Sequence, residues 1–315
     1  MRTASRPHTD SNPEPLSSRR LDALLADTSR TFALAIPLLP QPIRRQVTLA
    51  YLVFRIADTF EDADLWSREK RIAALAELGA LLDEHDLDRA RAAARDWLRQ
   101  PPVEHQGYLD LLGSTPQVLA AIGRLEPGPR RVLVRHTLRT AQGMAGFVRS
   151  SDDHAGLELT DLSELRRYCY VVAGIVGELL TDLVLLACKP LAGVAHSLRR
   201  SAASFGEGLQ LVNILKDSAG DARVGRRFLP QGLPAAEIFA LARRDLESAR
   251  DYVLSLHQAA APRGVIAFNA LPLLLARATL DRVERDGPGA KIKRGEVFAI
   301  LRRLHRDLAQ GSAPV

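Results

Sequence analysis

Apolar residues recur at helical spacing along almost the whole chain, and this periodicity favours an all-α fold. Leu, Ala and Arg dominate the long segments, and all three residue types favour helix. No segment alternates apolar and polar residues as a half-buried strand does, and no fixed-period repeat is present. Prolines and other breakers divide the pattern, and Asp161 with Glu164 forms a candidate helix cap. We expect helices near residues 18–36, 41–63, 67–84, 87–99, 106–122, 128–150, 161–187, 191–216, 234–259, 263–285 and 293–309.

The organisation of the chain is simple. Residues 1–18 mix Pro, Ser and Arg without an apolar stretch, which predicts a disordered arm rather than a signal peptide. No obvious linker interrupts the remaining sequence, so we expect one compact helical domain over residues 19–310.

The net charge of +6 is compatible with an anionic ligand, an acidic membrane surface or nucleic acid. Basic residues alternate with acidic ones and no nucleic-acid-binding motif is present, so nucleic acid is disfavoured. The two cysteines, Cys169 and Cys188, have no spacing that suggests a disulfide framework or a zinc site, which fits a cytoplasmic protein. The most apolar run, 171–188, contains Glu178 and Asp182 and is predicted to be a core helix rather than a membrane span. Peripheral contact with a membrane stays open.

One helix carries a narrow polar stripe on an otherwise apolar surface. In YLVFRIADTFED (51–62), Tyr51, Arg55, Asp58 and Asp62 follow one another at steps of four, three and four residues. At about 100° per residue they share one face, whereas the intervening residues are mostly apolar. Carboxylates one turn apart repel each other unless a proton or a cation lies between them. The stripe therefore predicts a cation site, with a solvated helix face or an ion-pair network as the alternative.

A second helix repeats this arrangement. In QLVNILKDSAGD (210–221), Gln210, Asn213, Asp217 and Asp221 succeed one another at steps of three, four and four residues. Carboxylate and amide oxygens suit Mg²⁺, which proteins commonly share with substrate phosphates. Two facing stripes would form a clamp for a metal-bound diphosphate.

Five segments together resemble the squalene/phytoene synthase family, from Asp27 to about Leu304. They are TSRTFALAIPLLP (28–40), YLVFRIADTFED (51–62), YCYVVAGIVGE (168–178), LQLVNILKDSAGDARVGRRFLP (209–230), and FNALPLLLARATL with KIKRGEV (268–280, 291–297). The resemblance implies a single helical domain around a deep central cavity, in which two prenyl diphosphates are joined head to head.

The resemblance also implies roles for individual residues. Mg²⁺ would be held by Asp58, Asp62, Asp217 and Asp221, with Asn213 and Gln210 supporting the second cluster. The diphosphates would be faced by Ser29, Arg30, Arg55, Lys216 and Arg226, although the family usually has arginine where Lys216 stands, and lysine gives up bidentate geometry. Tyr168 would lie near the reacting carbons, unless it is a core tyrosine. The substrate cavity would be lined by Tyr51, Phe32, Phe54 and Leu209.

The small residues Ala173, Gly174 and Gly177 lie within one predicted helix, where glycine costs stability unless something approaches closely. A prenyl chain and a neighbouring helix explain them equally well. Cys169 lies between two tyrosines without a visible base, so we expect it to pack rather than to react.

The reductant is predicted from Lys291, Lys293 and Arg294, which resemble the cationic segment by which squalene synthases engage NADPH. No Gly-x-Gly-x-x-Gly follows a strand, so a Rossmann site is excluded. We expect this cluster to open a helix, where cations oppose the helix dipole and an anionic partner would relieve the cost. A substrate diphosphate or an acidic lipid headgroup is an alternative partner.

Within the family, DTFED (58–62) and AQGMAGF (141–147) resemble squalene synthases most, which implies farnesyl diphosphate as substrate. The alternatives are synthases of phytoene, dehydrosqualene or presqualene diphosphate, which perform no reduction, and a non-catalytic binding or assembly protein. The last would be expected to lose metal aspartates, and all four are present. The sequence leaves the prenyl chain length and the oligomeric state open.

Overall fold

The computed structural model describes residues 16–151 and 157–315. The expected all-α fold is confirmed: within these residues the chain forms helices joined by short connections, and the one extended pairing is an isolated bridge between Glu158 and Arg227. The α-helices are α1 (Ser18–Thr28), α2 (Thr31–Ala35), α3 (Ile43–Glu61), α4 (Arg68–Glu84), α5 (Leu87–Arg99), α6 (Gln106–Gly113), α7 (Thr115–Gly123), α8 (Pro127–Ser150), α9 (Leu162–Cys169), α10 (Ile175–Ala187), α11 (Ala195–Asp221), α12 (Ala235–Gln258), α13 (Arg263–Asp286) and α14 (Arg294–Ala309).

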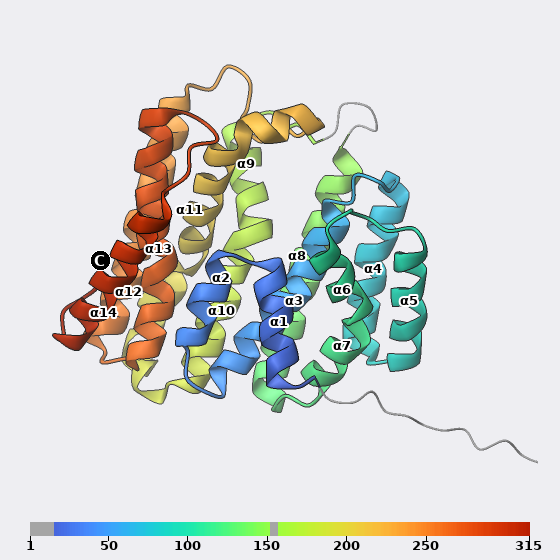
Figure 1. Ribbon diagram of the computed structural model, residues 1–315, viewed down its shortest axis with the longest axis horizontal. Helices are drawn as coiled ribbons and strands as arrows, with labels where there is room; N and C mark the ends of the chain where they lie inside the picture. The colour runs from blue at the N-terminus through green and yellow to red at the C-terminus, as the bar shows by residue number, and fades with distance from the viewer. Residues whose placement is uncertain (1–15, 152–156) are drawn as a thin grey trace, which may run out of the picture.

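The helices are arranged in two flanks around a central group (Figure 1). Helices α11, α12, α13 and α14 pack on one another at one side, and α4 to α7 lie at the other. Between them lie α3, α8 and α10, which contact one another, while α1 and α2 cover the front of the view. Because α3 belongs to the central group and α11 to one flank, their polar stripes come from different parts of the fold.

Several predicted helices are interrupted. The helix expected over 18–36 ends at Thr28, because Ser29 is extended and its hydroxyl accepts a hydrogen bond from the Phe32 N–H at 3.0 Å. The helix expected over 106–122 is divided at Ser114. A π-helical turn, Tyr170–Gly174, lies within the helix expected over 161–187, and α11 continues to Asp221 rather than ending near 216. The cap expected at Asp161 is confirmed, since its carboxylate accepts the Glu164 N–H at 2.8 Å.

The last residues of the predicted arm, 16–18, are among the described residues and belong to the helical fold. Leu16 is buried, and the hydroxyl of Ser17 caps α1 by accepting the Arg20 N–H at 3.2 Å. Helix α1 begins at Ser18. The rest of the predicted arm, residues 1–15, lies outside the described residues.

Two helical segments, Leu162–Ala187 and Arg263–Asp286, have the length and hydropathy of a membrane span. Core helices of soluble proteins meet the same criteria of length and hydropathy. In the first segment Glu178 bonds to Arg139 at 2.6 Å, and Asp182 bonds to Arg135 at 2.7 Å and to buried His136 at 3.2 Å. These interactions with α8 give both acids partners within the protein, as expected for a packed helix.

Candidate active site

Helix α3 holds its polar stripe with a chain of interactions that begins on α1. The Tyr51 hydroxyl donates to the Thr28 carbonyl at 2.6 Å and accepts from Arg55 Nε at 3.2 Å. One turn further on, Arg55 Nη1 lies 3.3 Å from Asp58 Oδ2. Burial alone would lower the pKa of Arg55, but the charge of Asp58 and the adjacent tyrosines raise it, so this arginine stays cationic.

Three carboxylates gather at the end of α3. Burial raises the pKa of Asp58 to about 6, and Arg55 opposes this rise. Burial, together with the charges of Asp62 and Asp58, raises the pKa of Glu61 well above its ordinary value. Burial also raises the pKa of Asp62, against the effect of Arg226. Asp62 is the more exposed aspartate, with 49% of its side chain accessible against 30% for Asp58, so its charge is better tolerated. The protein alone therefore does not fully compensate the negative charge at this end of α3.

The second stripe follows the last turns of α11. Lys216 Nζ contacts Asp217 Oδ2 at 3.1 Å and donates to Asn213 Oδ1 at 3.3 Å. Burial and the charge of Asp217 raise the pKa of Asp221, and Asp62 of α3 adds to the rise. Asp62 of the first stripe therefore acts electrostatically on the second stripe.

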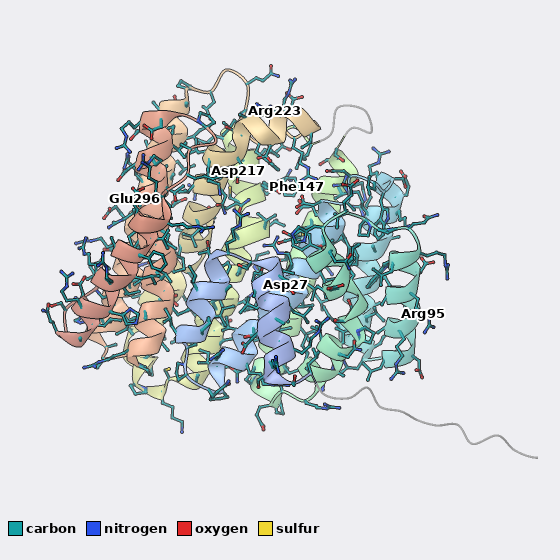
Figure 2. The ribbon with its side chains drawn as sticks, in the orientation of Figure 1. Asp27, Arg95, Phe147, Asp217, Arg223 and Glu296 are labelled. Carbon is teal, nitrogen blue, oxygen red and sulfur yellow. The ribbon has the colours of Figure 1, made fainter. Side chains whose placement is uncertain are left out.

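Arg226 connects the two stripes. Its backbone N–H donates to the Asp221 carbonyl at 2.9 Å, while its guanidinium reaches Asp62 Oδ1 at 2.5 Å and Asp64 Oδ1 at 2.6 Å. The chain is held in this position by the bridge that pairs Arg227 with residues 157–159. Figure 2 shows Asp217 on α11 and Phe147 on α8 in the upper part of the molecule. Arg223, in the connection that follows α11, lies above them.

These residues fit a divalent cation. Glu61 Oε1 is buried and has no hydrogen-bond partner among the described residues, and four neighbouring carboxyl groups, those of Asp58, Glu61, Asp62 and Asp221, have raised pKa values. No three His, Cys, Asp or Glu side chains in the described part of the chain form a complete metal-binding group. This donor set suits Mg²⁺, which retains water and takes further ligands from substrate phosphates.

Tyr168 lies beside the first stripe. It is 5% exposed and its ring packs against Phe147 at 5.2 Å and Phe228 at 4.9 Å. Burial raises its pKa well above 10, and the charges of Glu61, Asp62 and Asp58 contribute. The hydroxyl is therefore a neutral donor with aromatic neighbours and negative charge nearby. Cys169 is buried, and burial raises its thiol pKa, as expected for a packing residue.

Close helix packing accounts for Gly177 of α10, whereas the nearest contact of Gly174 lies within its own π-helical segment. A Cβ on Gly177 would lie 2.0 Å from the Ala202 carbonyl oxygen, and one on Gly174 would meet the Tyr170 ring at 2.8 Å. From the other side, a Cβ on Gly206 would lie 2.0 Å from the Ala173 carbonyl oxygen. Of the two explanations open from the sequence, the structure supports helix–helix contact for Gly177.

The other predicted substrate residues lie on α2, α3 and α11 and at the break between α1 and α2. Phe32 and Tyr51 pack ring to ring at 5.5 Å, and Phe54 is buried on α3. Ser29 is half-buried at the break between α1 and α2, next to exposed Arg30, while Gln210 and Leu209 are half-buried on α11. Their roles toward a substrate stay predictions.

The cationic cluster lies next to the second stripe, because the Gly289 N–H donates to the Lys216 carbonyl at 2.6 Å. Lys291, Lys293 and Arg294 are all exposed. The expectation that all three open a helix is wrong: α14 begins at Arg294, Lys293 is its cap residue, and Lys291 precedes it. Glu296 lies in the first turn, and its carboxylate accepts the Lys293 N–H at 2.8 Å, so the unfavourable charge is partly offset.

Sequence reasoning missed several residues of the site. Glu61 stood within the quoted motif but off the stripe. Asp64 binds Arg226, and Arg71 donates to the Glu61 carbonyl. Tyr108 of α6 faces Arg55, with the guanidinium carbon 5.6 Å from the ring centroid. The sequence could have identified Glu61, since it is a third acid in DTFED. It gives no indication of Tyr108, which lies far from Arg55 in sequence.

Comparison with known proteins gives consistent matches. The family model described as squalene/phytoene synthase matches residues 25–305. A squalene synthase from Eremothecium gossypii is 32% identical over 214 residues, which cover 68% of this chain and 46% of that protein. The chain spans between about half and two thirds of the length of the first curated relatives it matches.

Solved structures agree with this match. The complex of TcSQS with the ligand BPH1237 superposes with a TM-score of 0.71 at 25% identity, covering 91% of this chain and 85% of that one. A dehydrosqualene synthase in complex with a ligand has a TM-score of 0.62 at 19% identity, covering 93% and 96%, and supports the fold.

Proposed function

Because the chain belongs to the squalene/phytoene synthase family of head-to-head prenyl synthases, we propose that it converts two farnesyl diphosphates into squalene through presqualene diphosphate. The observation that carries the proposal is the pairing of two acidic stripes from α3 and α11 around Arg226, with Tyr168 beside them. A solvated helix face would not leave four carboxyl groups with raised pKa values at one place.

The positive side chains would bind and orient the diphosphates. Arg55 and Arg226 are held by fixed partners, and Lys216 lies at the second stripe. Guanidinium groups bind phosphate oxygens in a planar, bidentate manner, whereas Lys216 would act as a point charge. Such groups favour departure of a diphosphate because they stabilise negative charge as it develops.

Mg²⁺ would be held by Asp58, Asp62, Asp217 and Asp221, with Asn213 as a neutral oxygen ligand, and Glu61 is a further donor on α3. When bound, it would neutralise charge on the diphosphate as the bond to the allylic carbon breaks.

The apolar surroundings would protect the allylic cation from water. Tyr168 is enclosed by Phe147 and Phe228, whose ring faces tolerate positive charge. Because burial and nearby negative charge raise the pKa of Tyr168, its hydroxyl stays protonated and can hold a substrate group without becoming a base. The second prenyl chain would present its C2–C3 double bond to C1 of the first, at a distance set by the apolar side chains around the two substrates.

The finer assignment rests on the reductant. The Gly289–Lys216 hydrogen bond holds the segment of Lys291, Lys293 and Arg294 beside the second stripe, which suits the phosphates of NADPH. The same position suits a substrate diphosphate, and a synthase of dehydrosqualene, presqualene diphosphate or phytoene is the alternative. A non-catalytic relative is disfavoured because the acidic residues and their cationic partners are all present.

Product identification tests the proposal. The purified protein is incubated with Mg²⁺ and either farnesyl or geranylgeranyl diphosphate, with and without NADPH, and the products are identified by mass spectrometry. Squalene from farnesyl diphosphate only when NADPH is present supports the proposal. The same product with and without NADPH would transfer the assignment to a synthase without reduction. No coupled product from either substrate would reject catalysis of this kind.

A further inference from the structure

The guanidinium of Arg55 lies near two tyrosine rings that come from different helices. Its central carbon is 5.6 Å from the ring centroid of Tyr51 on α3 and 5.6 Å from that of Tyr108 on α6. Both distances are within the range of a cation–π interaction. Only 26% of the Arg55 side chain is exposed, so water screens these contacts less than it would at the surface.

Helix α6 is fixed against the same turn that orients Tyr51. A Cβ on Gly107 would lie 2.7 Å from the carbonyl oxygen of Asp27, so only glycine permits this approach of α6 to α1. Asp27 lies at the upper end of α1 in Figure 2 and precedes Thr28, whose carbonyl accepts the Tyr51 hydroxyl at 2.6 Å. The last turn of α1 therefore contacts both the Tyr51 hydroxyl and Gly107, the neighbour of Tyr108 in the chain.

Two kinds of group compete for the Arg55 guanidinium. Asp58 lies 3.3 Å from Nη1, and a tighter ion pair would occupy both this arginine and a carboxylate proposed to hold Mg²⁺. An aromatic ring attracts a cation through its quadrupole without neutralising it. Two such rings would hold the guanidinium in place and leave Asp58 available to a metal ion.

We propose that Tyr108 is a positioning residue that holds Arg55 in a diphosphate-binding orientation and away from a closed ion pair with Asp58. This inference rests on the proposed function, in which Arg55 faces a substrate diphosphate. It assigns a role to α6, which contributes none of the motifs that resemble the family. Tyr108 acts through Arg55 and is not itself a group that touches the reacting atoms.

The first test replaces Tyr108 by Phe and by Leu in the full chain. Tyr108→Phe retains the ring face and should keep kcat/KM within about twofold of the original value. Tyr108→Leu removes the cation–π contact and should lower kcat/KM for the prenyl diphosphate by about tenfold, as a cation–π contact of about 1 to 2 kcal/mol implies. It should also raise the Mg²⁺ concentration for half-maximal activity, because Arg55 then closes on Asp58. Equal kinetics for the Leu variant and the original protein would overturn the proposal.

The matched control is His105→Leu. The His105 ring contacts the Tyr108 ring with centroids 4.4 Å apart, and no ring contact joins His105 to Arg55 among the described residues. This variant perturbs the same helix end and should leave kcat/KM and the Mg²⁺ requirement unchanged. A loss equal to that of Tyr108→Leu would mean that α6 packing, rather than the ring over Arg55, is responsible, and would contradict the proposal.

A second measurement separates electrostatics from shape. Phenylalanine, monofluoro-, difluoro- and trifluorophenylalanine at position 108 have similar volumes, but their ring quadrupoles weaken in that order. The logarithm of kcat/KM should fall steadily along this series, whereas a purely structural ring would give a flat response and refute the inference. The series also decides the matter if the Leu variant does not fold.

Failure of the positioning role and failure of the proposed function give different results. If the original protein makes a coupled product and the fluorinated series is flat, only the role of Tyr108 fails. If the original protein makes no coupled product, the series is repeated with Mg²⁺-dependent binding of inorganic diphosphate, measured by calorimetry. A falling affinity then retains the positioning role without the proposed reaction, and a flat series or an absence of binding rejects it.

Discussion

Replacing Asp58 by Asn should stabilise the metal-free protein at neutral pH while removing most of its activity. Burial of the Asp58 carboxylate raises its pKa from 3.8 to about 6. At pH 7 the carboxylate is therefore charged in both states, and this charge is less favourable in the folded protein than in the unfolded chain. Asn has nearly the same shape and no charge. The substitution therefore relieves the unfavourable burial and deletes a proposed metal ligand at the same time.

The size of the effect is set by the two pKa values. The difference between 3.8 and about 6 corresponds to about 3 kcal/mol at 1.36 kcal/mol per pH unit. The pKa of about 6 already includes the opposing charge of Arg55, but the Asp58 side chain is 30% exposed and water screens the cost of its charge, so we expect a net gain of about 1 to 2 kcal/mol. For a chain of 315 residues, that gain raises the melting temperature by roughly 1.5 to 3 °C.

The sign of the pH dependence is fixed by the direction of the shift. A carboxyl group whose pKa is raised by folding favours the folded state below pH 3.8, and this contribution is lost as the pH rises to about 6. The stability difference between the Asp58→Asn variant and the original protein should therefore be small near pH 4 and reach its full value above pH 6.

Thermal unfolding with EDTA, followed by circular dichroism from pH 4 to pH 8, measures this difference. Adding Mg²⁺ with inorganic diphosphate should then stabilise the original protein more than the variant. Asp281→Asn on α13, where the Asp281 side chain is 61% exposed, is a control that should change stability by less than about 0.5 kcal/mol. An Asp58→Asn variant that is less stable than the original protein in EDTA at pH 7 would refute the electrostatic reasoning.

Three further substitutions probe the packing, the metal site and the cationic cluster. Gly177→Ala should lower the melting temperature by about 5 °C or more, because its Cβ would lie 2.0 Å from an opposing backbone carbonyl. The control Gly146→Ala, whose Cβ would have no atom within 4 Å, should not destabilise the protein. Equal melting temperatures of the two variants would contradict this prediction. Glu61→Gln should raise the Mg²⁺ concentration for half-maximal activity by about tenfold with the fold intact, because a carboxylate near the metal is lost. An unchanged Mg²⁺ titration would exclude a role of Glu61 at the metal site. Replacing Lys291 and Arg294 together by Ala should raise the KM for NADPH much more than that for farnesyl diphosphate, and equal changes in both would indicate a diphosphate site instead.

The parts of the fold that depend on local pattern could be predicted from the sequence. Helical periodicity defined most helices, and the spacing of Asp58 with Asp62 and of Asp217 with Asp221 placed each pair on one face. The breaks were missed where a single polar side chain competes with the helix, as Ser29 does when it accepts the Phe32 N–H. Apolar periodicity continues across such a position and does not indicate the helix break.

The parts of the site that depend on tertiary contact could not be predicted. The small residues near Gly177 had two explanations until the Ala202 carbonyl was seen to approach within 2.0 Å of the added Cβ position. The contact of Tyr108 with Arg55 joins residues 53 positions apart and depends on where α6 packs. Arg226 was expected to face a diphosphate, whereas its contacts with Asp62 and Asp64 depend on the connection that follows α11.

In the proposed site, the stripes of α3 and α11 hold one metal-bound diphosphate between them. A crystal structure with Mn²⁺ in place of Mg²⁺ and a thiodiphosphate analogue of farnesyl diphosphate, which does not ionise readily, tests it directly, because Mn²⁺ is located by its anomalous scattering. We predict anomalous peaks at Asp58 or Asp62 and at Asp217 or Asp221, with the oxygens of the same diphosphate bound to the metals on both sides. A diphosphate bound elsewhere, or Mn²⁺ absent from both stripes when the analogue is present, would contradict the account.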